Sequence, residues 1–287
     1  MTYETAQALR MALEQRLLSR SKETKVSLDR LRRRVLFERI VSRLDAAEPG
    51  RWVLKGGMAL EVRLLDDARL TKDIDLGLRG DVTDAEELRG QLVEALAIGV
   101  DGDEFRLIVG PVKQLMEDDG GRLTWRVKVA AELAGRPFGA VQVDVSPRSH
   151  ELDATDLVPL PNSLDFAGVV APLVEIVDVN RHAAEKFHGM LRDYGDRDNT
   201  RVRDLVDLVI LTEHELLEPA ALAAAVRLVW SERDGVSPPA TLPSLPPSWL
   251  GRYERLVAEQ TVEARSFPAA VSTVVAMWTE MFPTEET

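Results

Sequence analysis

The spacing of apolar residues changes once along the chain, and this change constrains the fold more than any other feature of the sequence. Up to residue 165, runs in which apolar and polar residues alternate, as they do in strands, are mixed with helical spacing. After residue 175 the spacing is helical throughout. We therefore expect an α+β domain over residues 1–165 and a helical domain over residues 166–287.

Individual elements follow from the same patterns. Strands are expected at 51–55 and 71–78, and an antiparallel hairpin is expected over 122–145, where two alternating runs flank the turn sequence AGRPFG. The expected helices are 24–46, 58–65, 83–97, 178–193, 201–213, 218–232, 249–262 and 265–281. The segment GVSPPATLPSLPPSW contains five of the 15 prolines and predicts a surface loop.

The composition excludes several classes of protein and site. Hydrophobic residues make up 45% and charged residues 29%, which is ordinary for a globular protein. The absence of cysteine excludes disulfides, thiolate zinc sites and a cysteine nucleophile. The N-terminus has no signal-peptide pattern, and no apolar stretch is long enough to span a bilayer. We therefore expect a cytoplasmic protein without membrane contact.

The charge is unevenly distributed. A net charge of −12 argues against a general nucleic-acid coat protein. Residues 20–43 nevertheless contain nine Lys or Arg residues, among them Arg32, Arg33 and Arg34, and only three acids. Two interpretations of this basic strip are open: it binds RNA at one place, or it is the solvated face of a helix.

Two carboxylates share one face of the strand expected at 71–78, whose sequence is TKDIDLGL. Side chains alternate across a strand, so Asp73 and Asp75 point the same way while Ile74 points into the core. Neighbouring carboxylates repel each other, and a divalent cation, Mg²⁺ or Mn²⁺, relieves the repulsion. On its own, Asp-x-Asp is also typical of a polar sheet face.

The neighbouring sequence favours the metal site. Gly56 and Gly57 separate a short strand from a helix, and glycines let a phosphate approach the backbone at the positive end of a helix. Asp144 is the acid in the valine-rich run VQVDV. Three carboxylates on adjacent strands, beside a glycine-rich helix start, indicate two-metal phosphoryl transfer.

Two blocks of sequence carry a family resemblance. VLKGGMAL (53–60), followed by LTKDIDL (70–76), resembles the DNA polymerase β-like nucleotidyltransferase superfamily. Together with AEKFH (184–188) and RVRDLVDL (201–208), it is similar to the AbiEii-type toxins of bacterial type IV toxin–antitoxin systems, including the mycobacterial MenT toxins. The resemblance covers roughly residues 50–215. It implies a polymerase β-like core, a mixed sheet with flanking helices, and a C-terminal helical module that completes the active-site cleft.

The resemblance also implies a function. It predicts a metal-dependent nucleotidyltransferase that moves a nucleotide from a nucleoside triphosphate (NTP) to a hydroxyl group. The implied acceptor is RNA, foremost the 3′ end of tRNA, whose blockage would stop translation and growth. The implied protein partner is an antitoxin. Two alternatives are open: transfer to a protein or an aminoglycoside, and a catalytically degenerate nucleotide-binding protein.

Site residues follow from the matched motifs. The expected metal ligands are Asp73, Asp75 and Asp144. The expected nucleotide-binding residues are Gly56, Gly57, Lys186 and Arg201. The expected catalytic group is Asp73, Asp75, Lys186 and Asp204. One departure concerns the nucleotide: the superfamily usually has a small hydroxyl residue where this chain has Met58, so backbone N–H groups would have to replace a hydroxyl contact.

Two acids in the later helix compete for a functional role. On a helical wheel, Asp204 falls between two leucines, so we expect it to be partly buried and to need Arg201 or Lys186 as a partner. Asp207 falls beside Arg203, which suits an exposed pair. The pattern therefore favours Asp204 over Asp207 as the functional acid.

Overall fold

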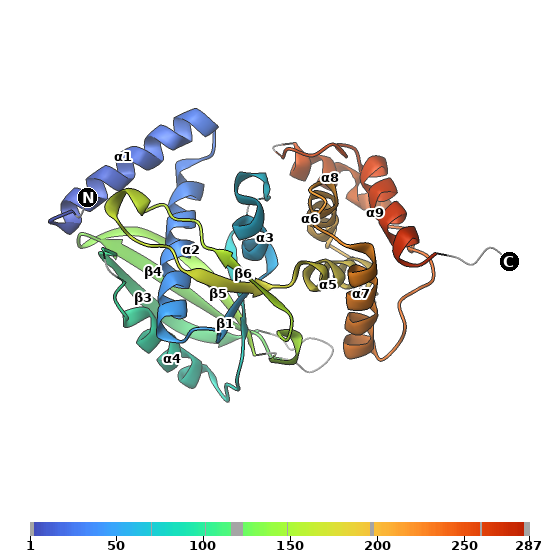
Figure 1. Ribbon diagram of the computed structural model, residues 1–287, viewed down its shortest axis with the longest axis horizontal. Coiled ribbons are helices and arrows are strands. Elements are labelled where there is room, and N and C mark those ends of the chain that lie inside the picture. Colours follow the sequence, from blue (N-terminus) through green and yellow to red (C-terminus); the bar gives the residue numbers. More distant parts are fainter. Residues whose placement is uncertain are drawn as a thin grey trace. The chain divides into compact units, whose positions relative to one another are not determined.

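The chain forms two compact units, which Figure 1 shows as ribbons. The computed structural model describes residues 3–69, 71–100, 102–115, 123–147, 149–195, 198–258 and 260–283. Unit 1 contains residues 1–63 and 70–177, and unit 2 contains residues 64–69 and 178–287. A sheet with helices in unit 1 and helices alone in the described part of unit 2 confirm the expected α+β class.

The described strands of unit 1 form one seven-stranded mixed sheet in the order β3-β4-β5-β2-β1-β7-β6. These strands are β1 (Trp52–Lys55), β2 (Asp73–Leu78), β3 (Phe105–Gln114), β4 (Trp125–Leu133), β5 (Arg136–Pro147), β6 (Thr155–Pro159) and β7 (Leu173–Val177). The helices are α1 (Ala6–Thr24), α2 (Leu28–Ala47), α3 (Gly56–Leu64) and α4 (Ala85–Ala97). Short 3₁₀ turns of unit 1 are η2 (Ser149–Glu151) and η3 (Asp165–Ala167), whereas η1 (Leu65–Asp67) belongs to unit 2.

Strand pairing places β2 at the centre of this sheet. It runs antiparallel to β1 and parallel to β5. The expected hairpin is confirmed in β4 and β5, apart from residue 122, which lies outside the described residues. Its two-residue turn, Ala134 and Gly135, has φ values of 53° and 68°, and such left-handed turns match the twist of antiparallel strands.

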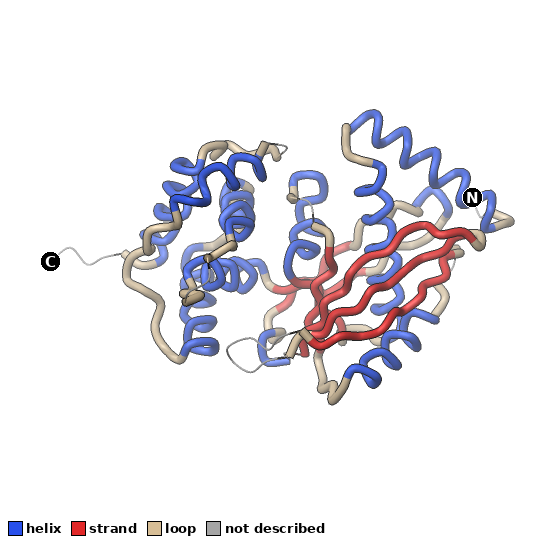
Figure 2. The backbone as a smooth tube through the Cα atoms, turned by 180° about the vertical axis from the view of Figure 1, so that it is seen from behind, coloured by secondary structure: helices blue, strands red, loops and turns tan. Residues whose placement is uncertain are grey.

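Alternation divides the sheet into an apolar and a polar face. Ile74, Leu76 and Leu78 of β2 are at most 2% exposed and belong to the core. Helix α2 packs against β5, and α4 packs against β3. Figure 2, seen from behind, shows the long strands in front of these helices. Asp73 and Asp75, on the alternate positions of β2, belong to the other face.

The helix expected at 24–46 is present as α2, whereas α1 was absent from the sequence-based expectation. Helix α1 ends at Lys25, which caps it with φ 63°, and α2 begins after Ser27, whose hydroxyl accepts a hydrogen bond from the Arg30 N–H. A left-handed residue stops one helix, and a serine cap begins the next. Strands β3, β6 and β7 were also absent from the sequence-based expectation.

Unit 2 is built around aromatic side chains. Its helices are α5 (Val179–Leu191), α6 (Val202–Glu213), α7 (Pro219–Asp234), α8 (Leu250–Val257) and α9 (Phe267–Met281), with a 3₁₀ turn η4 (Pro247–Trp249). Phe187 and Trp230 both contact the buried Trp278. The proline-rich segment between α7 and η4 is a loop, as expected. Among the described helices, none combines the length and apolar character needed to cross a membrane.

Candidate active site

Strand β2 presents two acids side by side on the polar face of unit 1. Asp73 and Asp75 are partly exposed, while Ile74 between them is fully buried. In the sheet register, Asp75 lies opposite Lys55 of β1 and opposite Asp144 of β5. The structure thus places the three acids of the sequence prediction on two adjacent strands.

Four charged residues on the adjacent strands β4, β5, β2 and β1 form a row across this face. Arg126 of β4 is paired with Asp144, Asp144 with Asp75, and Asp75 with Lys55. Laterally paired residues point to the same face of a sheet. Lys55 also donates to the buried Glu151 at 2.9 Å. Two neighbouring carboxylates are therefore flanked by a cation on each side.

Gly56 lets the first turn of α3 approach the acids. The helix starts directly after β1, and Gly56 has φ +55°. A Cβ at this position would lie 1.9 Å from Oδ2 of Asp75, so only glycine fits. Gly57 is buried, and the side chain of Met58, 1% exposed, packs into the core. What this turn can offer a ligand is therefore its backbone.

Asp144 is held by an arginine. Nε and Nη2 of Arg126 donate to the two Asp144 oxygens at 2.8 and 2.6 Å. The hydrogen bond to Asp144 is the main cause that raises the pKa of Arg126, and the charges of Asp73 and Asp75 add to it. The guanidinium therefore sits in the field of all three acids.

The acids have the right chemistry for a divalent cation, because carboxylate oxygens on one strand face suit Mg²⁺. Among the described residues, however, no three Asp, Glu or His side chains are gathered into a metal-binding group. The Asp144 carboxylate is turned to Arg126 instead. The donor set fits a metal ion if Asp144 gives up this partner.

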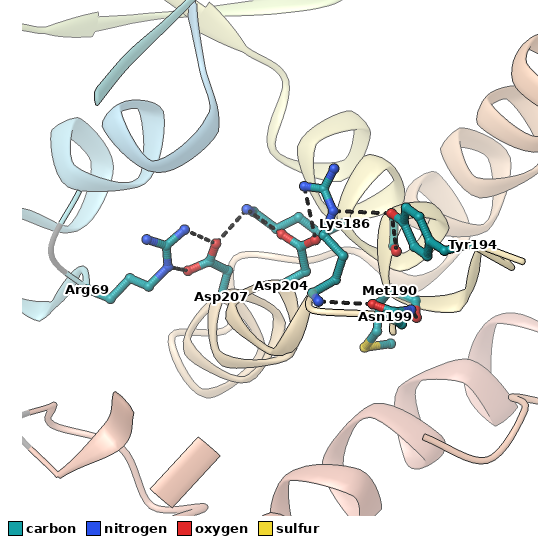
Figure 3. Close-up of polar contacts among 9 residues, drawn as sticks. Arg69, Lys186, Met190, Tyr194, Asn199, Asp204 and Asp207 are labelled. Atoms are coloured by element: carbon teal, nitrogen blue, oxygen red, sulfur yellow. Dashed lines mark hydrogen bonds and ion pairs between the residues drawn. The ribbon is translucent and has the colours of Figure 1, made fainter. Parts of the chain in front are cut away.

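Unit 2 carries a second polar cluster, drawn in Figure 3. Arg69 binds Asp207 through two hydrogen bonds, of 2.6 Å from Nε and 2.9 Å from Nη2. Lys186 of α5 donates to the same Asp207 at 2.5 Å and lies 3.6 Å from Asp204. Arg201, at the start of α6, lies 3.8 Å from Asp204. Lys186 and Arg69 therefore share Asp207, and Lys186 and Arg201 both lie within ion-pair distance of Asp204.

The predicted exposure of Asp207 is wrong. Its side chain is 0% exposed, and its partners are Arg69 and Lys186 rather than Arg203. Burial is the largest single influence and would raise the pKa of Asp207. The charges and hydrogen bonds of Arg69 and Lys186 together outweigh burial and lower it. Asp207 is thus a permanent anion at the centre of the cluster.

Asp204 behaves as the sequence predicted. It is nearly buried, and both expected partners, Lys186 and Arg201, lie beside it. Burial raises its pKa, while the charge of Lys186 opposes the shift. Gly189 of α5 leaves room for this acid, since a Cβ there would lie 3.3 Å from Asp204 Oδ2. Sequence reasoning missed Arg69, which stands alone between a helix and a strand in no recognisable pattern.

Local contacts support the position of Arg201. Its backbone N–H donates to Asn199 at 2.9 Å, and its Nε donates to the Tyr194 hydroxyl at 3.2 Å. Tyr194 in turn donates to the Gly189 carbonyl at 3.1 Å (Figure 3). The Arg201 side chain is nevertheless 56% exposed, so it can meet a ligand from solvent.

The basic strip at 20–43 is only partly at the surface, so it is not as a whole the solvated face of a helix. Arg34 pairs in the interior with Glu61 at 3.0 Å, and Arg43 pairs with Asp103 at 3.1 Å. Arg39 is also fully buried. The reason is that α2 is buried almost all round between residues 34 and 44. The arginines of this stretch therefore serve the interior of unit 1.

Comparisons with known structures agree with this architecture. MenT4, a nucleotidyltransferase toxin from Mycobacterium tuberculosis H37Rv, aligns with a TM-score of 0.57 and 19% identity over 96% of this chain and 90% of its own. JHP933 from Helicobacter pylori aligns with a TM-score of 0.45 and 17% identity, covering 86% and 89% of the two chains. The fold is that of the polymerase β-like nucleotidyltransferases.

Sequence comparison identifies the family. Among curated proteins, none matches the chain significantly. The family described as nucleotidyl transferase AbiEii toxin, type IV TA system, matches residues 39–275, which include both polar clusters. The matched region covers most of the chain. The protein therefore belongs to the AbiEii family of nucleotidyltransferase toxins of type IV toxin–antitoxin systems.

Proposed function

We propose that this protein transfers a nucleotide from an NTP to the 3′ end of tRNA and thereby blocks translation and growth. The observation that carries the proposal is the pair Asp73 and Asp75, side by side on one strand face with the glycine start of α3 packed against Asp75. Family membership supports the reaction class. The antitoxin of such a system is the proposed protein partner.

In unit 1, Asp73 and Asp75 would hold Mg²⁺ or Mn²⁺, with Asp144 as a third ligand. When bound, the cation would activate the acceptor hydroxyl and stabilise the charge of the triphosphate and the departing pyrophosphate. Gly56 and Gly57 would offer backbone N–H groups to phosphate at the positive end of α3. The close contact between Gly56 and Asp75 supports this shared location.

In unit 2, we assign the triphosphate to the cations of the second cluster. Lys186, Arg69 and Arg201 carry the ammonium and guanidinium groups that donate charge-assisted hydrogen bonds to phosphate oxygens. Asp207 holds Lys186 and Arg69 in place, and Asp204 lies between Lys186 and Arg201.

The reaction itself exchanges a phosphoanhydride bond of the NTP for a phosphoester bond to the acceptor. The acceptor hydroxyl oxygen forms a bond to the α-phosphorus, and its proton leaves to solvent. The bond between the α-phosphorus and the bridging oxygen breaks, and pyrophosphate leaves with that electron pair. Positioning and charge stabilisation supply most of the rate in such transfers, which suits a site made of fixed acids and cations.

A labelling experiment tests the proposal. The protein is incubated with each of the four α-labelled NTPs, Mg²⁺ and total RNA, and the labelled RNA is sized and mapped at its 3′ end. We expect label in tRNA from at least one NTP. Asp75→Asn should lower the rate by about a thousandfold or more, because a metal ligand is lost. Asp81→Asn, which changes an exposed acid after the same strand, is the matched control.

Two outcomes would contradict the proposal. Label in a protein or in an aminoglycoside, and not in RNA, would overturn the acceptor. Equal labelling by wild type and Asp75→Asn would overturn the site.

For the second cluster, Lys186→Ala should weaken NTP binding. The affinity for Mn²⁺ should stay within about twofold, because Lys186 is not one of the proposed metal ligands.

A further inference from the structure

Arg126 occupies both oxygens of Asp144, the third acid of the candidate metal site. Its fork covers both oxygens of Asp144, at 2.8 and 2.6 Å, and a carboxylate needs one of these oxygens to bind a metal ion. The register of the sheet fixes this contact, because Arg126 and Asp144 lie opposite each other on β4 and β5. The contact is therefore built into the sheet and does not depend on a flexible loop.

The pair is also suited to exchange. The Asp144 side chain is 14% exposed, whereas the Arg126 side chain is 41% exposed. Solvent screens an ion pair with this exposure, so a divalent cation that gains a third carboxylate can displace the guanidinium. Without Arg126 or a metal ion, Asp144 and Asp75 would lie opposite each other on adjacent strands as like charges, which destabilises a sheet.

We propose that Arg126 is a positioning residue that holds Asp144 in the metal-free protein and competes with the divalent cation for it. This inference rests on the proposed function, since it assumes a metal site at Asp73 and Asp75. Arg126 then has two effects. It lowers the affinity of the site for the cation, and it stabilises the sheet while the cation is absent.

The first test measures Mn²⁺ affinity by electron paramagnetic resonance in the full chain, without nucleotide. Arg126→Met should bind Mn²⁺ about tenfold more tightly than wild type, because Asp144 no longer has a competing partner. Asp144→Asn in the Arg126→Met background should remove most of this gain. Arg126→Lys, which keeps the charge but loses the fork, should fall between wild type and Arg126→Met.

Lys128 provides a matched control. It lies two residues along β4 on the same face, is exposed, and is paired in register with Gln142 rather than with an acid. Lys128→Met removes a nearby positive charge without freeing a carboxylate. We expect it to change Mn²⁺ affinity by no more than about twofold, which separates a general charge effect from competition for Asp144.

The second test uses thermal unfolding, which is independent of catalysis. In EDTA, Arg126→Met should unfold at a lower temperature than wild type, and saturating Mn²⁺ should raise its unfolding temperature more than that of wild type. A merely structural role would give the loss in EDTA without the larger gain in Mn²⁺.

Three outcomes would overturn the inference, and they are distinguishable. Equal affinities of Arg126→Met and Lys128→Met would show that only net charge matters. No effect of Asp144→Asn in the Arg126→Met background would show that Asp144 is not the contested ligand. If Asp75→Asn does not change Mn²⁺ binding in any background, the proposed metal site fails together with the role of Arg126.

Discussion

At the scale of single residues, Asp207 shows how a distant partner changes the role of a side chain. A helical wheel places it beside Arg203, yet its partner Arg69 lies 138 residues earlier in the chain. Together with Lys186, this arginine makes a fully buried carboxylate stable as an anion. Asp207 therefore orients two cations, and its loss would leave them buried against each other.

We predict that Asp207→Asn lowers the free energy of unfolding by about 3 kcal/mol or more, because it removes the charge of the buried carboxylate that Lys186 and Arg69 both contact. Asp204→Asn should cost no more than about 1 kcal/mol, because burial disfavours the ionised form that the substitution removes. Urea unfolding of both variants measures the difference. Equal losses would mean that the two acids share the structural role.

The residues that sequence analysis found are defined by a single element, whereas those that it missed are defined by partners on other elements. The shared face of Asp73 and Asp75 follows from the alternation of a single strand, and the burial of Asp204 follows from a single helix. Arg69 and Arg126 matter only through acids on other elements. A local pattern contains no information about such partners, so neither arginine could be identified in advance.

At the scale of elements, α2 contacts other segments of unit 1 through buried polar side chains. Glu38 of α2 accepts hydrogen bonds from the backbone N–H and the hydroxyl of Ser163. Burial raises the pKa of Glu38 from 4.5 to about 7, even though the bonds from Ser163 and the charge of Arg39 oppose the shift. The folded protein therefore keeps a proton on Glu38 over a pH range in which the unfolded chain has lost it.

This raised pKa predicts a pH dependence of stability. Below pH 4.5 both states bind the proton, and between 4.5 and about 7 only the folded state does, so stability falls as the pH rises through this window. Relative to Glu38→Gln, wild type should lose up to about 3 kcal/mol across the window. Urea unfolding at both ends measures this, with the exposed Glu86→Gln as control. A constant difference between wild type and Glu38→Gln would contradict it.

Elements with an uninterrupted pattern were predicted well. The strand at 71–78 and the hairpin of β4 and β5 alternate without a break. Strand β3 was missed because Gly110 and Pro111 resemble a turn, whereas the structure places them at a bulge between Val109 and Val112. β6 and β7 have five residues each, too few for alternation alone to identify.

At the scale of the whole molecule, the question is how a chain of net charge −12 would hold RNA. In the basic strip at 20–43, the side chains of Arg34, Arg39 and Arg43 are buried. Arg32 and Arg33 pair with Glu14 and Asp29. Arg20, Lys22 and Lys25, at the end of α1 and its cap, are exposed, whereas Arg30 on α2 is half-buried. An RNA acceptor would therefore meet few phosphate-binding cations in this region.

We predict that this α1 end supplies the phosphate contacts of the strip. The double variant Arg20→Gln and Lys22→Gln should weaken RNA labelling, and it should flatten the log–log salt dependence by up to about two units, or about one per lost contact. Labelling is measured from about 50 to 200 mM salt, where counterion release dominates the change in affinity. Arg252→Gln with Arg255→Gln, on an exposed stretch of α8, is the matched control. If both double variants keep the wild-type slope, RNA is held without either surface. The exposed Arg201 in the second cluster would then be the next cation to replace, because it can reach a phosphate from solvent.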